Sequence, residues 1–192
     1  GIILFSRNLD SFEQIKELTH SIKKIFKDQN YPILIDQEGG RINRLNKLIE
    51  TSFFSSEFFG NLYKENKIKF SLYYKVYISQ IAYLLTELGI NINTVPVLDV
   101  RRKKSSKVIG NRSYSSSPQN VSNLGNFCIN EFTKYNIGTV IKHIPGHGLA
   151  KVDSHHFTPI VNKKLSYLLK KDLNSFKNKK TFFAMTAHII FN

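Results

Sequence analysis

The sequence of 192 residues contains one cysteine, one methionine and no tryptophan. A single cysteine cannot form a disulfide within the chain, which is typical of proteins from a reducing compartment. No run of about twenty apolar residues is present, so a membrane-spanning helix is not expected. No signal peptide is recognisable at the first residues. We therefore predict a cytoplasmic location.

Acidic residues are also scarce: 14 Asp and Glu stand against 28 Lys and Arg, which gives a formal net charge of +14. Such an excess can indicate binding to nucleic acid or to another anionic surface. The lysines, however, are scattered over segments of helical periodicity, apart from the run at residues 101–104, and no nucleic-acid-binding motif accompanies them. We interpret the charge as a solvated surface and predict no nucleic-acid partner.

The apolar residues are sufficient for a core, because 41% of the chain is hydrophobic and 15 residues are Phe. Short apolar runs alternate with segments of helical periodicity. The runs predict strands at residues 1–7, 32–35, 94–99, 138–142 and 181–188, and the periodic segments predict helices at about 10–26, 64–88, 117–135 and 165–176. This alternation predicts a single α/β domain over residues 1–192, built on a parallel sheet.

The same periodicity predicts the helix boundaries and the buried faces. Residues 10–13 resemble a capping box that opens the first helix, and Ser117 with Pro118 forms a good start for the third. Gly89 is expected to end the long second helix. The residues expected on its buried side are Ile68, Leu72, Val76, Ile81, Leu84, Leu85 and Leu88.

Polar clusters follow the predicted strands, at residues 7–8, 36–41, 99, 142–148 and 186–188. A (β/α)8 barrel builds its active site from the carboxyl ends of its strands. A doubly wound open sheet places its ligand there as well. The chain has no Gly-x-Gly-x-x-Gly sequence, which disfavours the nucleotide-binding form of the open sheet.

The densest cluster is the loop Lys142-His-Ile-Pro-Gly-His-Gly148, followed by Asp153-Ser-His155. It gathers an ammonium group, three imidazoles and a carboxylate directly after a strand. Pro and Gly allow tight turns and prevent the strand from continuing. Asp153 precedes His155 by two residues and can fix its tautomer, as for a working acid/base. We therefore predict that these two residues form a proton-transfer pair.

Two further motifs are candidate binding elements. In Asp36-Gln-Glu-Gly-Gly-Arg41, followed by Arg44, a carboxylate that accepts two sugar hydroxyls beside an arginine would form a glycan clamp. The alternative is a strand-ending turn with a structural ion pair. The second motif is Gly110-Asn-Arg-Ser-Tyr114, whose Arg112 alone would be interpreted as a surface residue.

These motifs, in this order, resemble glycoside hydrolase family 3, and in particular its bacterial β-N-acetylhexosaminidases that recycle peptidoglycan. The resemblance implies a (β/α)8 TIM-type barrel that is incomplete here, since about five strands are visible and the chain opens on a core strand. One strand should then precede Gly1 and at least two should follow Asn192.

The resemblance also implies roles for individual residues. His155 would be the general acid/base with Asp153 as its partner, and the substrate-binding residues would be Asp36, Arg44, Arg112, Lys142 and His143. Asp99 would be structural or pocket-forming. The strand end that carries His188 would line the pocket, and the alternative is a core strand with a polar terminus. Apart from the resemblance, His147 is interpreted as a residue that stabilises the glycine-rich loop. The expected substrate is an N-acetylglucosamine-containing muropeptide, with no cofactor and no metal.

A retaining glycosidase needs a nucleophile as well as an acid/base. The family nucleophile is an Asp in a run like Ser-Asp-Asp-Leu, and no matching run occurs in this chain, so the chain by itself is expected to be inactive. The alternatives are a non-catalytic glycan-binding protein and a β-glucosidase of the same family. A metal site formed by His143, His147, His155 and His188 is disfavoured, because Pro145 and Gly146 break the helix that such a spacing requires.

Overall fold

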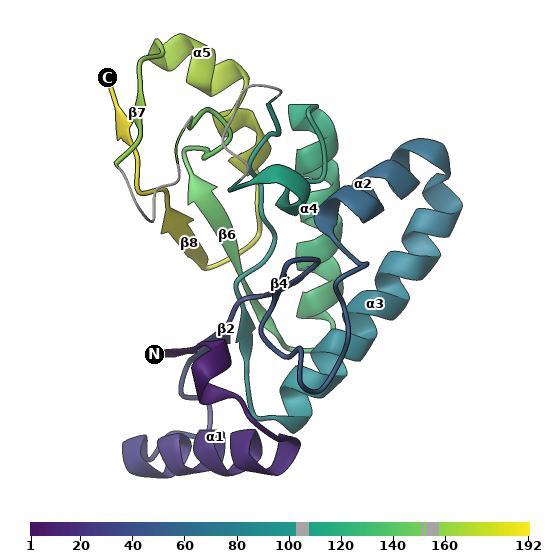
Figure 1. Ribbon diagram of the computed structural model, residues 1–192, viewed down its shortest axis with the longest axis vertical. Coiled ribbons are helices and arrows are strands. Elements are labelled where there is room, and N and C mark those ends of the chain that lie inside the picture. Colours follow the sequence, from purple (N-terminus) through teal and green to yellow (C-terminus); the bar gives the residue numbers. More distant parts are fainter. Residues whose placement is uncertain (103–107, 151, 153–157) are drawn as a thin grey trace.

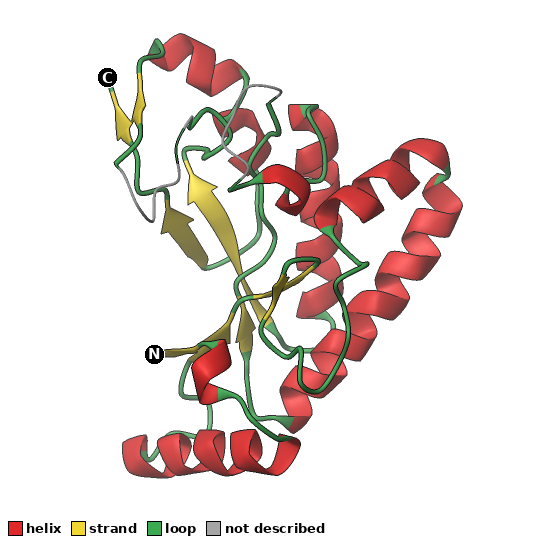
Figure 2. Ribbon diagram, viewed as in Figure 1, coloured by secondary structure: helices red, strands yellow, loops and turns green. Residues whose placement is uncertain are grey.

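The computed structural model describes residues 1–102, 108–150, 152 and 158–192. Its centre is a five-stranded parallel sheet with the order β1–β2–β5–β6–β8. These strands comprise Ile2–Leu4, Ile33–Ile35, Ile92–Asn93, Gly138–Ile144 and Phe183–Thr186. Two small two-stranded sheets accompany it, formed by β3 (Gln37–Gly39) with β4 (Ile42–Asn43) and by β7 (Ile160–Val161) with β9 (Ile190–Phe191). Figure 2 shows the strands beside the helices that connect them.

The strand order distinguishes between the two architectures left open by the sequence. Spatial order follows chain order without reversal, whereas a doubly wound sheet reverses its order at a switch point. Right-handed crossovers that all run in one direction place their helices on one side of the sheet, and Figure 1 shows α3 and α4 packed along the same side. The sheet is therefore a parallel half-barrel, consistent with an incomplete barrel.

The helices are α1 (Phe12–Phe26), α2 (Ser56–Glu65), α3 (Lys67–Glu87), α4 (Pro118–Thr133) and α5 (Leu165–Lys170), with 3-10 turns η1 (Ser6–Asn8), η2 (Gly110–Arg112) and η3 (Leu173–Phe176). Ser117 caps α4 with Pro118 at the first turn, and Gly89 with a φ of 71° follows the end of α3, which confirms both predictions. The cap of α1 is Ser11, whose side chain accepts the N–H of Gln14, so the predicted capping box is shifted by one residue.

Two predicted elements are wrong in their extent. The predicted strand at residues 94–99 is replaced by β5, which ends at Asn93. Pro96 has no N–H to donate to a ladder, and beyond it only Val97 forms an isolated bridge, to Lys142. The predicted helix at 165–176 is divided into α5 and η3, and the buried Asp172 lies between them.

The predicted buried face of α3 is also partly wrong. Ile81, Leu85 and Leu88 are buried, but Ile68, Leu72 and Val76 are 83%, 58% and 53% exposed. The helix is apolar around most of its circumference, so periodicity alone does not distinguish its faces. Packing decides instead: the ring of Tyr74 lies 4.2 Å from Phe59 of α2 and 5.7 Å from Phe127 of α4, measured between ring centroids. Among the described residues, no helix is both long and apolar enough to cross a membrane.

Candidate active site

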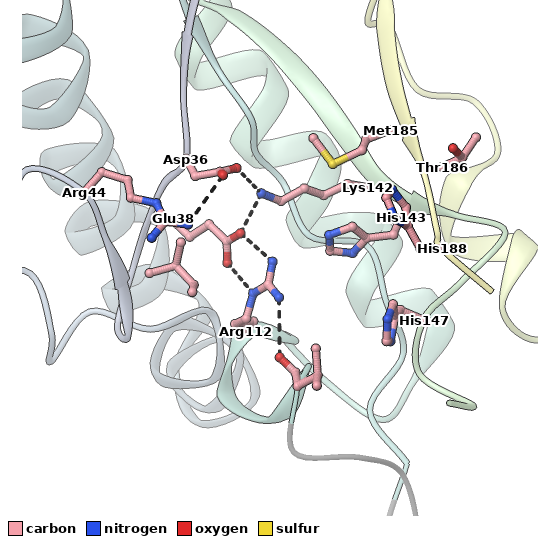
Figure 3. Close-up of a pocket in the computed structure, with 12 residues that line it drawn as sticks. Asp36, Glu38, Arg44, Arg112, Lys142, His143, His147, Met185, Thr186 and His188 are labelled. Atoms are coloured by element: carbon pink, nitrogen blue, oxygen red, sulfur yellow. Dashed lines mark hydrogen bonds and ion pairs between the residues drawn. The ribbon is translucent and has the colours of Figure 1, made fainter. Parts of the chain in front are cut away.

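A pocket of about 390 Å³ lies at the carboxyl ends of the sheet strands. Figure 3 shows side chains from several separate segments pointing toward it. All five residues predicted to bind substrate line this pocket, and so does His188, as predicted. The lining residues are Asp36, Glu38, Ile42, Arg44, Val108, Arg112, Lys142, His143, His147, Met185, Thr186 and His188.

Asp36, immediately after β2, lies beside the ammonium group of Lys142 from β6. Lys142 Nζ donates to Asp36 Oδ1 at 2.8 Å, and the hydroxyl of Thr94 donates to the same oxygen. Oδ2 has Arg44 Nη2 at 3.7 Å and is the less engaged oxygen. Burial disfavours the charged form of Asp36, but the Lys142 ammonium and the Thr94 hydroxyl together hold the pKa of Asp36 below its usual value. Asp36 therefore stays ionised, with one oxygen available to accept a ligand hydroxyl.

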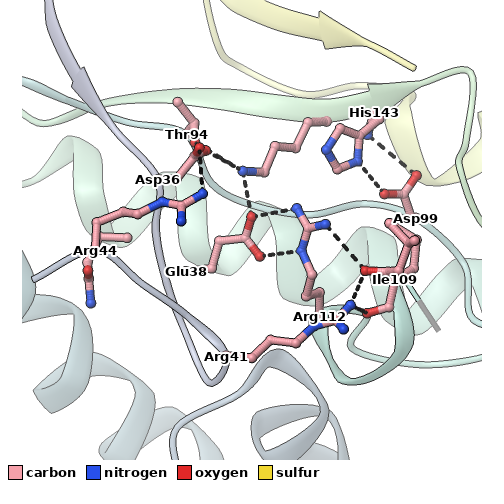
Figure 4. A network of polar contacts seen from close by, with 12 residues as sticks. Asp36, Glu38, Arg41, Arg44, Thr94, Asp99, Ile109, Arg112 and His143 are labelled. Carbon is pink, nitrogen blue, oxygen red and sulfur yellow. Dashed lines mark hydrogen bonds and ion pairs between the residues drawn. The ribbon is translucent and has the colours of Figure 1, made fainter. Parts of the chain in front are cut away.

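Glu38 lies at the centre of the network drawn in Figure 4, and its role was not predicted from the sequence. Arg112 donates to it through Nε and Nη2, both at 2.8 Å, and Lys142 Nζ lies 2.6 Å from Oε1. Burial favours the neutral acid, yet the two cations together lower the pKa of Glu38 to about 2. An ionised carboxylate that is held on both oxygens is poorly suited to donate a proton or to attack a substrate. Glu38 instead positions Lys142 and Arg112.

The hairpin formed by β3 and β4 brings Glu38 into the pocket. Gly39 has a φ of 83°, and a side chain there would begin 2.4 Å from the carbonyl oxygen of Phe54. Both conditions require glycine. The two glycines that follow Glu38 in the sequence were the available signal that the chain turns sharply here, and the buried acid is the residue before that turn.

The hydrogen-bond donors of Lys142 are relevant to its predicted role in binding substrate. An ammonium group has three N–H donors, and Nζ lies 2.8 Å from Asp36, 2.6 Å from Glu38 and 3.0 Å from Thr94. The side chain is 1% exposed. In this state Lys142 holds the two carboxylates in place, and its direct contact with a sugar stays a prediction.

Asp99 fixes the other side of the pocket. This fully buried carboxylate accepts a hydrogen bond from the backbone N–H of His147 at 2.6 Å, and its Oδ2 lies 2.7 Å from His143 Nδ1. Burial acts to raise the pKa of Asp99, but the contacts with His143 and with the backbone N–H and ring of His147 together lower it. In a neutral His143 this contact places the proton on Nδ1 and leaves Nε2 as an acceptor. Burial lowers the pKa of the His147 ring, which favours its neutral form.

The predicted catalytic pair, Asp153 and His155, lies outside the described residues, as does His156. Their placement in the pocket therefore stays a prediction. The segment that leads to them is described as far as Ala150, which is buried and donates its N–H to His147 O at 3.1 Å. Within the described residues, no group of three or more His, Cys, Asp or Glu side chains is arranged to hold a metal ion.

A parallel half-barrel with a charged pocket at the carboxyl ends of its strands is characteristic of TIM-barrel-like domains. Comparison with known families then gives the assignment. Residues 1–192 match the N-terminal domain of glycosyl hydrolase family 3, and the chain belongs to this family.

The relatives agree with this assignment. The chain is 34% identical to a β-hexosaminidase of Nitrosomonas eutropha over 200 residues, which cover 100% of the chain and 55% of the relative. It is also 34% identical to β-hexosaminidase A of Pseudoalteromonas piscicida, covering 98% of the chain and 32% of that protein. The crystal structure of native NagZ from Neisseria gonorrhoeae superimposes with a TM-score of 0.89 and 29% identity, covering 100% of the chain and 56% of NagZ. The chain thus spans about half the length, or less, of these relatives.

Proposed function

We propose that this chain forms the substrate-binding part of a retaining β-N-acetylhexosaminidase that removes terminal β-linked N-acetylglucosamine from peptidoglycan-derived muropeptides in the cytoplasm. The observation that carries the proposal is the convergence of Asp36, Arg44, Arg112, Lys142 and His143 around one pocket of about 390 Å³. The names of the β-hexosaminidase relatives support the substrate class, and NagZ from Neisseria gonorrhoeae has been crystallised with N-trifluoroacetyl-D-glucosamine.

The geometry suggests how the pocket would hold a sugar. Asp36 Oδ2 is the carboxylate oxygen with the weaker protein contact, 3.7 Å from Arg44, and it is suited to accept hydroxyl hydrogen bonds. Arg112 and Lys142 are neutralised by Glu38 and Asp36, so the pocket presents aligned polar groups without a large net charge. Such prearranged dipoles hold a substrate without reorganisation at the moment of reaction.

The chemistry requires two further groups. In the proposal, His155 protonates the leaving oxygen and later activates water, while Asp153 orients its ring. The nucleophile would be an aspartate in a segment that follows residue 192 in the family pattern. Neither carboxylate of the described pocket is suited to that role, since Glu38 is held on both oxygens and Asp36 is held by Lys142, Thr94 and Arg44.

The test uses the full-length natural protein with chromogenic N-acetyl-β-glucosaminide and β-glucoside substrates. We expect release from the N-acetylglucosaminide and a loss of about 10²–10⁴-fold in kcat in His155→Ala, in the range typical of general acid/base catalysis. Release only from the glucoside would contradict the substrate class. Binding of N-acetylglucosamine without release from either substrate would identify a glycan-binding protein instead. Release of N-acetylglucosamine from a muropeptide then tests the physiological substrate.

A further inference from the structure

The segment Gly146–Ala150, which we call the loop root, leads from β6 to the predicted catalytic pair. It is enclosed on three sides by described residues. Asp99 accepts the N–H of His147 at 2.6 Å, and a side chain at Gly148 would begin 2.0 Å from the carbonyl oxygen of Val100. At Gly146, which has a φ of 135°, a side chain would begin 2.9 Å from Cβ of Asp172. The loop root is therefore packed directly against Asp172.

Asp172 is a buried carboxylate that is paired with an arginine. Its side chain is 1% exposed, and Arg102 Nη2 donates to both of its carboxylate oxygens, at 3.1 and 3.0 Å. The turn that carries it is itself fixed, because Ser175 Oγ donates to the carbonyl oxygens of Leu98 and Asp172 at 2.7 and 2.8 Å. Burial raises the pKa of Asp172 although Arg102 opposes the change. Burial makes the charged form of Asp172 unfavourable, so the carboxylate depends on its ion pair with Arg102. Removing one member of a buried ion pair is strongly destabilising.

The pair lies beside the pocket and not in it. Neither Arg102 nor Asp172 belongs to the residues that line the 390 Å³ pocket. Arg102 extends from the loop that follows Val100, and Asp172 lies between α5 and η3. The pair thus joins two segments on either side of the loop root without contributing to the sugar-binding surface.

We propose that the Arg102–Asp172 ion pair is a positioning element, which holds the loop root in the orientation that delivers His155 to the glycosidic oxygen. This inference rests on the proposed function, because it needs a catalytic group beyond the loop root. Its physical basis is that a change in the orientation of the loop root would displace His155, which follows Ala150 by five residues in the sequence. A misplacement of about 1 Å in a reacting group can cost about 10²-fold in rate.

The test compares two neighbouring arginines in the full-length natural protein. Arg102→Gln removes the positive charge that pairs with the carboxylate of Asp172. Arg101→Gln is the matched control, because Arg101 leaves the same loop but pairs with Glu57 of α2, away from the loop root. We expect Arg102→Gln to lower kcat by about tenfold to a hundredfold with KM for the chromogenic N-acetylglucosaminide within about twofold. Arg101→Gln should leave both constants within about twofold.

A second pair of variants separates positioning from stability. Asp172→Asn keeps the shape of the side chain and its contact with Gly146 but removes the charge, so it should lower kcat to a similar degree. The double variant should then lose little more than either single variant, as expected for residues that act as one unit. Unchanged kcat in Arg102→Gln, with only a lower melting temperature, would overturn the inference. Absence of activity in the natural protein would overturn the proposed function instead, so the two failures are distinguishable.

Discussion

Two of the hollows formed by the described residues are similar in size but differ completely in chemistry. The first is the pocket of about 390 Å³, lined by three carboxylate-binding cations, two carboxylates and three imidazoles. The second is a hollow of about 500 Å³ between α2 and α3, lined mainly by Phe, Tyr, Leu, Ile and Val side chains. Size therefore does not identify the candidate active site. The convergence of ionised groups from separate strands does.

The β3–β4 hairpin lies next to both hollows. Glu38 and Ile42 of the β3–β4 hairpin line the charged pocket. Thr51, whose backbone carbonyl oxygen accepts the N–H of Gly40 at 2.9 Å, lines the apolar hollow. The hairpin thus separates a network that depends on charge from a region that depends on packing. Substitutions on the two sides of the hairpin should differ in the size of their effect on stability and in the pH dependence of that effect.

The largest effect is expected at Lys142. Lys142→Met removes the cation that lies between Asp36 and Glu38 and leaves two buried carboxylates close together. We expect a loss of about 3–5 kcal/mol in the free energy of unfolding, as for breaking a buried ion pair, measured by denaturant titration of the full-length protein. Lys75→Met, at an exposed position of α3, is the control and should change stability by less than about 0.5 kcal/mol. Equal effects at the two lysines would contradict the proposed dependence of the pocket on charge.

The next effect is a pH dependence at Glu38. Its pKa of about 2 lies below the usual value of 4.5, so its stabilisation is present above pH 4.5 and is lost as pH falls toward 2. Between pH 6 and pH 3 this loss amounts to about 2 kcal/mol. Glu38→Gln should therefore be less stable than the natural protein at pH 6, and the difference should shrink by about this amount at pH 3. A difference that does not change with pH would show that Glu38 is not ionised at pH 6.

The smallest effect concerns the two faces of α3. Ile78 is 0% exposed and Ile68 is 83% exposed on the same helix. Ile78→Val should cost about 1 kcal/mol, because it leaves a small cavity in the core, whereas Ile68→Val should cost less than about 0.5 kcal/mol. Thermal melting of both variants measures the difference. Similar costs would indicate that the outer face of α3 is covered in the natural protein.

The sequence by itself determined the class of fold and most of the pocket. Alternating apolar runs and helical segments predicted a parallel α/β sheet, and the polar residues after the runs predicted the edge at which Asp36, Lys142 and His143 meet. Arg112 was assigned to this edge only through the family resemblance. These features depend on local periodicity and on the geometry of parallel strands, which a sequence displays directly. The roles of Asp153 and His155 stay predictions.

Only the tertiary structure decided which remote segments lie side by side and which charged groups pair with one another. The unreversed strand order showed a half-barrel, aromatic packing selected the buried face of α3, and the position of Glu38 between Lys142 and Arg112 fixed its charge. Arg102 and Asp172 are 70 residues apart in the chain and meet only in the folded protein. Pairings of this kind depend on distances between remote segments and on local burial, and neither quantity is encoded in the spacing of residues along the chain.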